Sequence, residues 1–409
     1  MVARTTWQPL VQQSRPAAPA GPELAGLLRR AAQVPSLAGK YRSFTDGSAG
    51  ETALDELPLM RPEELSRAVA EVLALRGAGG GVSSLWAGGG SLAEPGLSLL
   101  PEDMYAGRVR REWSPVGPGD VLANLHPLER MRPDHLFFHR FAAESGATGM
   151  SFGRLPGGGH EEWPDLFARL GVTSIAAPAE VVSQLLGNAE AGRPLPWLRT
   201  LLLGGSALDA TPDRAIADCF PYTEVWRLYG SVATGPIGRR GPLCLADVYH
   251  PLAHQYVEIA DGRLLVTSLD LDRRPPLLRY DTGDRGEFTY CVCDQPGAAV
   301  RLTDSSSPYF RLRGRTVSAR ELVDLALAAG DVEAAQVAVD RTDRPERMQL
   351  RVRLSPGVPD DSYTLDWIRY RVLENHLVLA CCVVEHPEIL EVVSAEGPFT
   401  PDVLVHDTF

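Results

Sequence analysis

The sequence predicts an α/β protein with a large N-terminal domain of mainly parallel sheets and an antiparallel subdomain, followed by a small C-terminal α+β domain of ferredoxin-like order. Three observations predict this fold class. At 409 residues the chain is too long for one ordinary core. From residue 120 onward, short apolar runs alternate with helical patterns, as in parallel sheets with helical crossovers. Near residue 255 closely spaced strands with Asp-Gly and Thr-Gly turns replace that alternation.

The N-terminal part is expected to be flexible over residues 1–20 and helical after it. The first 21 residues mix polar residues with Pro and Ala and hold no continuous apolar stretch, so we expect neither a signal peptide nor a membrane anchor. Residues 22–33 and 62–76 have the apolar spacing of amphipathic helices, the second beginning with Pro62 and two acids. Both helices are expected to pack on the large domain.

The remaining elements follow in order along the chain. The large domain, expected over 21–303, contains the alternating strand and helix patterns at 121–125, 135–145, 172–177, 179–189, 198–203, 212–219 and 223–228, and then the antiparallel strands at 256–268 and 277–293. The small domain, expected over 304–409, has helices at 319–329 and 365–376 and strands at 335–340, 348–354 and 379–386. The hinge is expected near residues 300–308.

Composition narrows the class of function. A hydrophobic fraction of 44% with 22% charged residues is ordinary for a globular protein. The net charge of −12 excludes a nucleic-acid partner, which needs a basic face. We expect a cytoplasmic protein without a membrane partner, and reduced thiols, because six cysteines are too few for a disulfide framework in this length.

Lys40 is the only lysine, and every other basic residue is arginine or histidine. Any mechanism that needs a lysine must therefore use Lys40. Arginine does not substitute freely, because its guanidinium differs in shape and its charge is fixed.

Three short motifs occur in a fixed order: Leu203-Gly204-Gly205-Ser206-Ala207, Tyr229-Gly230-Ser231 and Arg279-Tyr280-Asp281-Thr282-Gly283-Asp284. Together they resemble the adenylate-binding motifs of the adenylate-forming ligases, the acyl- and aryl-CoA ligase superfamily. Three further stretches, 34–47, 54–65 and 311–324, are similar to the phenylacetate-CoA ligase branch. The resemblance covers nearly the whole chain and identifies it as a divergent member.

The resemblance implies a nucleotide site at Gly204, Gly205, Tyr229, Gly230 and Asp284. Glycines after a parallel strand admit a flat ligand, an aspartate can accept two ribose hydroxyls, and a tyrosine can stack on a base. The implied ligand is AMP or an acyl-adenylate, and the implied acceptor is CoA or the pantetheine of a carrier protein. Taken singly, these residues also fit ordinary turns.

A metal centre is predicted at Cys244, His250, Cys291 and Cys293. Three thiolates and one imidazole suit a structural zinc ion, and some members of the phenylacetate-CoA ligase branch resemble this arrangement. His254 is the reserve ligand because the histidine spacing is short of that pattern. Four reduced residues in a core are the alternative, and Cys381 and Cys382 are expected to lie in the core of a strand.

The departures from the family pattern all fall on the triphosphate side. The phosphate loop corresponds to residues 89–95, where Leu92 replaces a hydroxyl and Glu94 stands in place of a lysine, so the loop would repel phosphates. Ala233 stands in place of the acid that holds Mg²⁺. The hinge falls on 304–308, or on Gly314-Arg315 in another alignment, and the C-terminal lysine is missing from 396–401. We therefore expect impaired binding and adenylation of ATP with Mg²⁺.

Three functions remain open on these grounds. The first is a divergent enzyme of specialised metabolism that transfers the acyl group of a small carboxylic acid, taken as an acyl thioester or adenylate, with His126 or His139 as general base. The second is a non-catalytic pseudoenzyme that binds a nucleotide or a partner. The third is a conventional ATP-dependent acyl- or aryl-CoA ligase. A carrier protein or a second copy of the chain is the expected protein partner.

Overall fold

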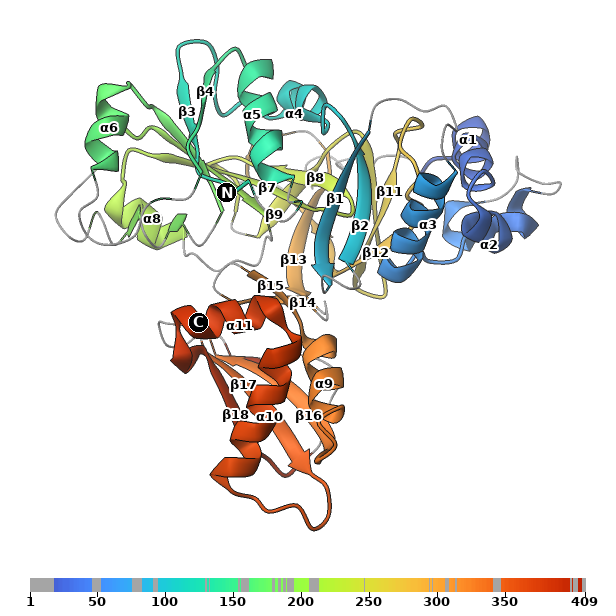
Figure 1. Cartoon of the computed structure of the whole chain (residues 1–409). Helices are drawn as coiled ribbons and strands as arrows, with labels where there is room; N and C mark the ends of the chain where they lie inside the picture. Colours follow the sequence, from blue (N-terminus) through green and yellow to red (C-terminus); the bar gives the residue numbers. More distant parts are fainter. Residues whose placement is uncertain are drawn as a thin grey trace, which may run out of the picture.

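The computed structural model describes most of the chain (Figure 1). The described residues are 18–45, 53–75, 83–90, 95–128, 131, 133–153, 155, 162–178, 181–182, 185–186, 189, 195–205, 213–245, 247–293, 295, 297–305, 309–312, 315–340, 347–397, 399 and 404–406. No helix within these ranges is long and apolar enough to cross a membrane.

Three helices at the N-terminal end pack together beside the sheet: α1 (Gly21–Ala31), α2 (Pro35–Thr45) and α3 (Pro62–Ala74). The two helices predicted from the apolar spacing are thereby confirmed. Pro62 stands at the first position of α3, where its missing N–H leaves no hydrogen bond unmade. The side chain of Glu64 accepts a hydrogen bond from the backbone N–H of Arg61 at 2.8 Å, which closes the first turn of the helix.

One 11-stranded sheet forms the body of the large N-terminal part, in the order β10-β11-β12-β13-β9-β8-β7-β6-β5-β3-β4. Five neighbouring strands are parallel: β3 (Val121–Asn124), β4 (Thr148–Ser151), β5 (Ser174–Ala177), β6 (Thr200–Gly205) and β7 (Glu224–Ser231). The described connections carry α5 (Asp134–Glu144), α6 (Trp163–Arg169) and α8 (Asp213–Cys219). The alternation in the sequence predicted β3, β5, β6 and β7 and the helices α5 and α8, but not β4 or α6. The predicted helix at 179–189 lies largely outside the described residues.

The other strands of this sheet are antiparallel: β8 (Gly235–Arg240), β9 (Val248–Pro251), β10 (Gln255–Ala260), β11 (Arg263–Ser268), β12 (Tyr280–Thr289) and β13 (Ala299–Ser305). The change of direction comes at β8, some 20 residues before the position expected from the sequence. A separate hairpin joins β1 (Ser83–Gly90) and β2 (Pro95–Pro101), and α4 (Ala106–Glu112) follows it.

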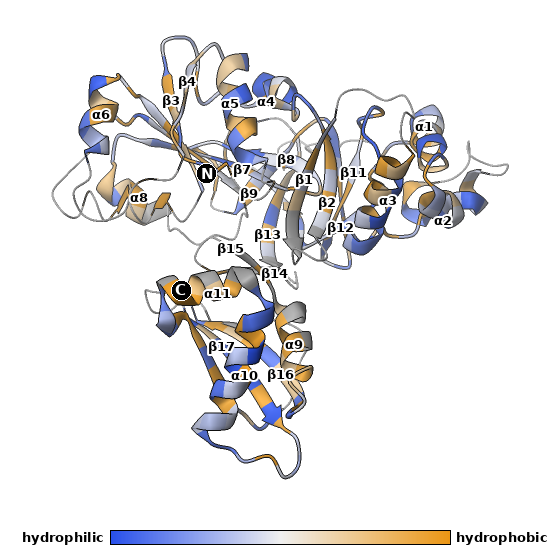
Figure 2. Cartoon of the chain, in the orientation of Figure 1, coloured by the Kyte–Doolittle hydropathy of each residue, from blue (hydrophilic) through white to orange (hydrophobic). Residues whose placement is uncertain are grey.

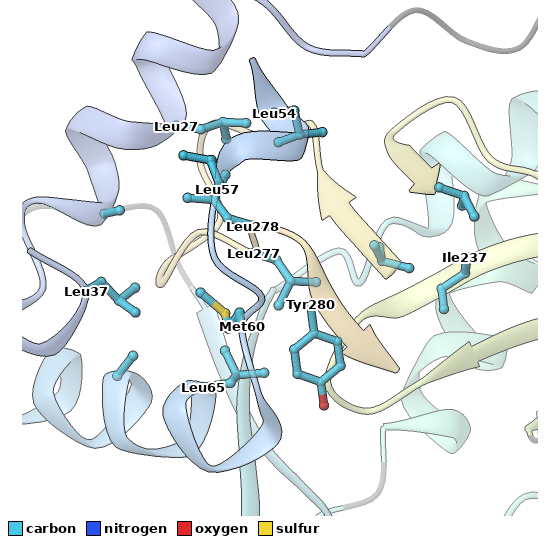
Figure 3. Packing of buried hydrophobic residues seen from close by; sticks show 14 of the residues in the cluster. Leu27, Leu37, Leu54, Leu57, Met60, Leu65, Ile237, Leu277, Leu278 and Tyr280 are labelled. Carbon is cyan, nitrogen blue, oxygen red and sulfur yellow. The ribbon is translucent and has the colours of Figure 1, made fainter. Parts of the chain in front are cut away.

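An apolar cluster fixes the N-terminal helices against the antiparallel strands (Figure 3). Met60 stands at its centre, fully buried, and its backbone bridges to β12. The N–H of Met60 donates to the carbonyl of Arg279 at 3.1 Å, and its carbonyl accepts from Asp281 at 2.9 Å. This bridge ties the stretch before α3 to the start of β12, the strand that carries Asp284.

The C-terminal part has its own four-stranded sheet and its own core (Figures 1 and 2). The sheet runs β18-β17-β16-β19, with β16 (Val332–Asp340), β17 (Arg347–Leu354), β18 (Leu390–Ser394) and β19 (Leu404–His406). The helices are α9 (Ala319–Leu327), α10 (Ser362–Asn375) and α11 (Leu377–Glu385). A hairpin of β14 (Tyr309–Leu312) and β15 (Arg315–Ser318) precedes them, and β15 contacts β1 of the large part.

One predicted strand of this part is a helix. Residues 377–384 are continuously apolar, so the periodicity of the predicted strand at 379–386 does not distinguish a strand from a buried helix, and residues 377–385 form α11. The imidazole of His376 caps that helix by accepting from the N–H of Leu379 at 3.1 Å. Cys382 lies in the core as predicted, but on a helix; the side chain of Cys381 is outside the described set. Strand β18 takes the place in the sheet, beside β17, that the predicted strand was expected to fill.

Candidate functional site

The predicted nucleotide residues converge at the carboxyl edge of the parallel strands. Gly204 and Gly205 end β6, and Gly205 is paired with Tyr229 on β7. The hydroxyl of Tyr229 donates to Oδ2 of Asp284 on β12 at 2.5 Å. This contact joins two residues that are 55 positions apart in the sequence. Open α/β sheets bind ligands at this edge.

The Tyr229–Asp284 contact is buried. Tyr229 is 4% exposed, and its ring lies 5.5 Å from that of Tyr249. Burial raises the pKa of Tyr229 well above its ordinary value, and the neighbouring carboxylate of Asp284 adds to the effect. The phenol therefore stays protonated and continues to donate. Its predicted role of stacking on a base remains a prediction.

Two of the predicted glycines are required by the protein's own packing. A Cβ atom on Gly204 would lie 2.8 Å from the ring of Phe138, and one on Gly230 would lie 2.3 Å from the carbonyl oxygen of Gly235. Real Cβ atoms do not come this close, so in either case the neighbouring atoms would have to shift. Close packing inside the protein is therefore enough to explain why glycine stands at these two positions, without a ligand.

The two candidate bases differ in their surroundings. His126 is 1% exposed, and its ring stacks on Phe138 at 4.6 Å between centroids, beside Gly204. Its backbone N–H donates to the side chain of Asn124, at the end of β3. His139 lies on an exposed face of α5, with Nδ1 3.1 Å from Oγ of Ser151. Only His126 is adjacent to one of the predicted nucleotide residues.

The turn after β7 is held from beneath by buried polar side chains that the sequence did not single out. The guanidinium of Arg273 donates to the carbonyls of Ala233 and Thr234, the second at 3.2 Å. The amide of Gln255 donates to the carbonyls of Thr234 and Pro236, both at 3.1 Å. Arg273 lies in an Arg-Arg-Pro-Pro stretch whose sequence resembles an ordinary polar loop, so no pattern marks it as buried.

The four predicted metal ligands come together. Their ligand atoms all lie within 4.8 Å of one another. Sγ of Cys293 is 3.5 Å from Sγ of Cys244 and 3.1 Å from Nε2 of His250. A tetrahedral zinc ion with bonds of about 2.0–2.3 Å separates its ligand atoms by roughly 3.3–3.8 Å, so small side-chain movements would bring this set to the geometry of the ion.

The environment of the cluster suits the same ion. Burial and the nearby Arg239 lower the pKa of His250 to about 4, so its imidazole is neutral and can act as a ligand. Burial raises the pKa of Cys244 to about 12, a cost that a bound cation would offset. His254, the reserve ligand, is not in the cluster: its ring stacks on Tyr105 at 4.6 Å.

The described contacts of Lys40 are with residues of the N-terminal helical segment and not with the predicted nucleotide residues. Its ammonium contacts both carboxylate oxygens of Glu64 at 2.6 Å and the carbonyl of Leu59 at 2.5 Å, between α2 and α3. Burial alone would raise the pKa of Glu64, but hydrogen bonds from Lys40 and from the N–H of Arg61 outweigh it and lower the pKa. The single lysine is thus engaged in a structural ion pair.

The structure describes only some of the positions at which the sequence departs from the pattern of the adenylate-forming ligases that it resembles. Ala233 packs against the main core, and Asp304 and Ser305 belong to β13. The alternative hinge position Arg315 begins β15. Outside the described residues are 91–94 with Leu92 and Glu94, 306–308, Gly314 and parts of 396–401.

Comparison with known proteins identifies the fold. No family model matches the sequence, and no curated protein matches it. A solved structure of 2-hydroxyisobutyryl-CoA ligase with 2-HIB-AMP and CoA, in the thioesterification state, is similar with a TM-score of 0.69 and 14% identity, covering 94% of this chain and 88% of that one. An amide bond synthetase from Marinactinospora thermotolerans gives 0.54 at 19% identity, covering 78% and 66%.

The same ligase is matched in other states. Its open conformation gives a TM-score of 0.56 and a postadenylation state 0.56, at 14% and 13% identity and again over 94% of this chain. The chain therefore has the fold of the adenylate-forming CoA ligases. At these identities the likeness establishes the fold and leaves the activity to be argued from the residues.

Proposed function

We propose that the protein binds a small acyl or aryl carboxylate in activated form and transfers its acyl group to a thiol, without carrying out ATP-dependent adenylation. In this proposal it is a divergent relative of the phenylacetate-CoA ligases, with a large domain over 21–303 and a small domain over 304–409. The nucleoside of an acyl-adenylate binds at Gly205 and Asp284.

The main observation that supports the proposal is the ion pair between Lys40 and Glu64. Adenylation of a carboxylate by ATP concentrates negative charge between the acid and the phosphates, and the relatives use lysines to stabilise it. Here the sole lysine is held by Glu64 at 2.6 Å, and its side chain is 16% exposed. To act on a phosphate it would have to leave the partly buried carboxylate of Glu64 without its partner, at a cost of about 1–3 kcal/mol.

The comparisons support an arrangement of the two parts suited to the transfer step. Among structures of one ligase that cover the same 94% of this chain, the thioesterification state gives a TM-score of 0.69 and the postadenylation state 0.56. The arrangement of the two parts, with β15 against β1, thus resembles that of a ligase poised for the second half-reaction.

The proposed step needs positioning and a base. The thiol sulfur forms a bond to the acyl carbon, the bond from that carbon to the phosphate oxygen breaks, and AMP leaves as an anion. The thiol proton passes to a base, for which we propose His126 because it adjoins Gly204; His139, on the exposed face of α5, is the second choice.

We further propose that Cys244, His250, Cys291 and Cys293 hold a structural zinc ion. The ion would join the loop after β8, strand β9 and the segment after β12. Metal analysis should find one zinc per chain, and Cys293→Ser should lose it and lower the Tm. Cys219→Ser, a free cysteine on α8, is the matched control. A chain purified without bound metal, and indifferent to added zinc, overturns this assignment.

Titration calorimetry tests the nucleotide part of the proposal. We expect AMP to bind and ATP with Mg²⁺ to bind much more weakly, with AMP affinity reduced in Asp284→Asn. Tight binding of ATP with Mg²⁺ would restore a conventional ligase. Binding of AMP with no acyl transfer from any adenylate or thioester would favour the pseudoenzyme.

A further inference from the structure

Helix α10 carries three aromatic side chains on its outward face. Tyr363, Trp367 and Tyr370 are 80%, 42% and 55% exposed, whereas Ile368 on the inward face is fully buried in the core of the small part. The rings of Trp367 and Tyr370 stack at 5.8 Å between centroids. The helix packs on α9, α11 and β18 (Figure 1). Its aromatic face is therefore open to a partner.

The exposed aromatic surface is large for a single helix. A tyrosine or tryptophan buries about 150–250 Å², so the exposed fractions of these three rings leave roughly 350 Å² of side-chain surface in water. Exposed apolar patches of a few hundred Å² often mark the site of an interaction. We call this set of Tyr363, Trp367 and Tyr370 the α10 stripe.

The spacing of the α10 stripe indicates the kind of partner. Its members are separated first by four residues and then by three, which is the d-a-d spacing of a coiled-coil seam. A seam with this repeat packs against the same repeat on another helix. A second α10, from another copy of the chain, is therefore a matching surface.

The charges beside the stripe favour a second copy that runs parallel to the first. In the heptad that the aromatic residues define, Asp366 holds position g and Arg371 holds position e of the next heptad. Parallel helices place these two positions side by side, so a twofold axis along the helices makes the pair twice. Antiparallel helices would instead bring the two Asp366 side chains together and the two Arg371 side chains together.

The seam ends at the last turn of α10. Glu374 occupies the next a position and accepts from Arg371 of its own chain at 2.9 Å. Two copies in parallel would bring their Glu374 carboxylates together, which is unfavourable for like charges. The guanidinium of Arg371 has five donors, so it can serve both carboxylates. The apolar contact is thus confined to the three aromatic positions.

We propose that the α10 stripe binds the α10 stripe of a second copy of this chain, in parallel about a twofold axis, with Asp366 of each copy paired to Arg371 of the other. An interface of this size lies below about 1,200 Å² in total, where association is weak. We therefore expect a dissociation constant of about 1–100 μM. The proposal is independent of the proposed activity, because it concerns only the outward face of the small part.

Sedimentation equilibrium of the full chain tests the pairing directly. As the concentration rises from about 1 to about 500 μM, the average mass should rise from the 44.3 kDa of one chain toward twice that value. A chain that stays monomeric over this range would overturn the proposal and leave the stripe to a different partner.

Substitutions of apolar and seam residues place the contact on α10. Trp367→Ala should weaken the dimer at least about thirtyfold, because it removes the central ring. Glu374→Leu should tighten it about tenfold, because it extends the seam by one apolar position. Tyr222→Ala removes an aromatic side chain of the large part that is 93% exposed, and should leave the dissociation constant within about twofold. A dimer that withstands Trp367→Ala would lie on another surface and refute the assignment.

Charge substitutions distinguish parallel from antiparallel pairing. Asp366→Arg should weaken the dimer at least about tenfold, and the added change Arg371→Asp should restore it to within about threefold of wild type. Asp366→Asn removes an attraction from parallel helices but a repulsion from antiparallel ones, so we expect weaker pairing. Tighter pairing of Asp366→Asn would overturn the parallel arrangement. The substituted side chains are exposed, so thermal unfolding should give each variant a Tm close to that of wild type.

Discussion

At the scale of single residues, buried polar groups distinguish this chain from an ordinary α/β sheet. Tyr229 and Asp284 form one short contact, and Arg273 and Gln255 brace the adjacent turn. These groups are largely shielded from water, so their hydrogen bonds and charge states affect the free energy of unfolding as well as ligand binding. His254 offers the clearest measurement, because its protonation is coupled to folding.

The stability of the protein should fall in mild acid because of His254. Burial lowers its pKa from 6.5 to about 4, so between these values the unfolded chain binds a proton that the folded chain does not. This contribution is present above pH 6.5 and is lost as the pH falls toward 4, and amounts to about 3 kcal/mol. Denaturant unfolding should show a flatter pH dependence for His254→Gln than for wild type.

A matched variant controls for the other ionisable groups. His139→Gln removes an exposed histidine and should keep the pH dependence of the wild type. Identical pH profiles for His254→Gln and wild type would contradict a buried neutral imidazole.

At the scale of elements, close backbone approach sets which substitutions β6 and β7 tolerate. A Cβ on Gly204 meets the ring of Phe138, which can shift, whereas a Cβ on Gly230 meets the backbone of Gly235 and Pro236, which cannot. Gly204→Ala should cost about 1–2 kcal/mol and Gly230→Ala at least about 3 kcal/mol. Phe138→Leu should rescue Gly204→Ala in denaturant unfolding but leave Gly230→Ala unchanged; equal costs for both glycines would refute the argument.

The elements that the sequence predicted best were those with a clear period. The amphipathic helices near 22–33 and 62–76, and the strands β3, β5, β6 and β7, follow directly from apolar spacing. The helix α11 was missed because a continuously apolar run fits either a strand or a buried helix.

The candidate site was predictable only where short motifs mark it. The approach of Cys244, His250, Cys291 and Cys293 followed from ligand chemistry and spacing. The burial of Arg273 did not, because it depends on long-range packing against residues more than 30 positions away. Periodicity and composition carry no trace of such contacts.

At the scale of the whole molecule, the ion pair of Lys40 with Glu64 connects helix α2 to helix α3. Lys40→Met should lower the free energy of unfolding by about 1–3 kcal/mol, because Glu64 is left partly buried without its partner. AMP affinity should stay within twofold of wild type in calorimetric titration, and Glu64→Gln should have a similar effect on stability. Loss of ligand binding with unchanged stability would contradict a structural role for Lys40.

The arrangement of the large and the small part is the second observation at this scale. The small part contacts the large one through β15 and β1, and the whole superposes best on a ligase in its thioesterification state among the states compared. The single lysine, paired with Glu64, and the net charge of −12 are the grounds on which we propose acyl transfer from a ready-made donor in place of ATP-dependent adenylation.

The central claim is tested most directly by measuring the two half-reactions separately. The protein is mixed with benzoyl-adenylate and CoA, and, in a second experiment, with benzoate, ATP and Mg²⁺, while thioester and pyrophosphate are followed. We predict thioester formation in the first mixture and no pyrophosphate above the protein-free control in the second. Pyrophosphate release at a rate matching thioester formation would contradict the account and make the protein a conventional ligase.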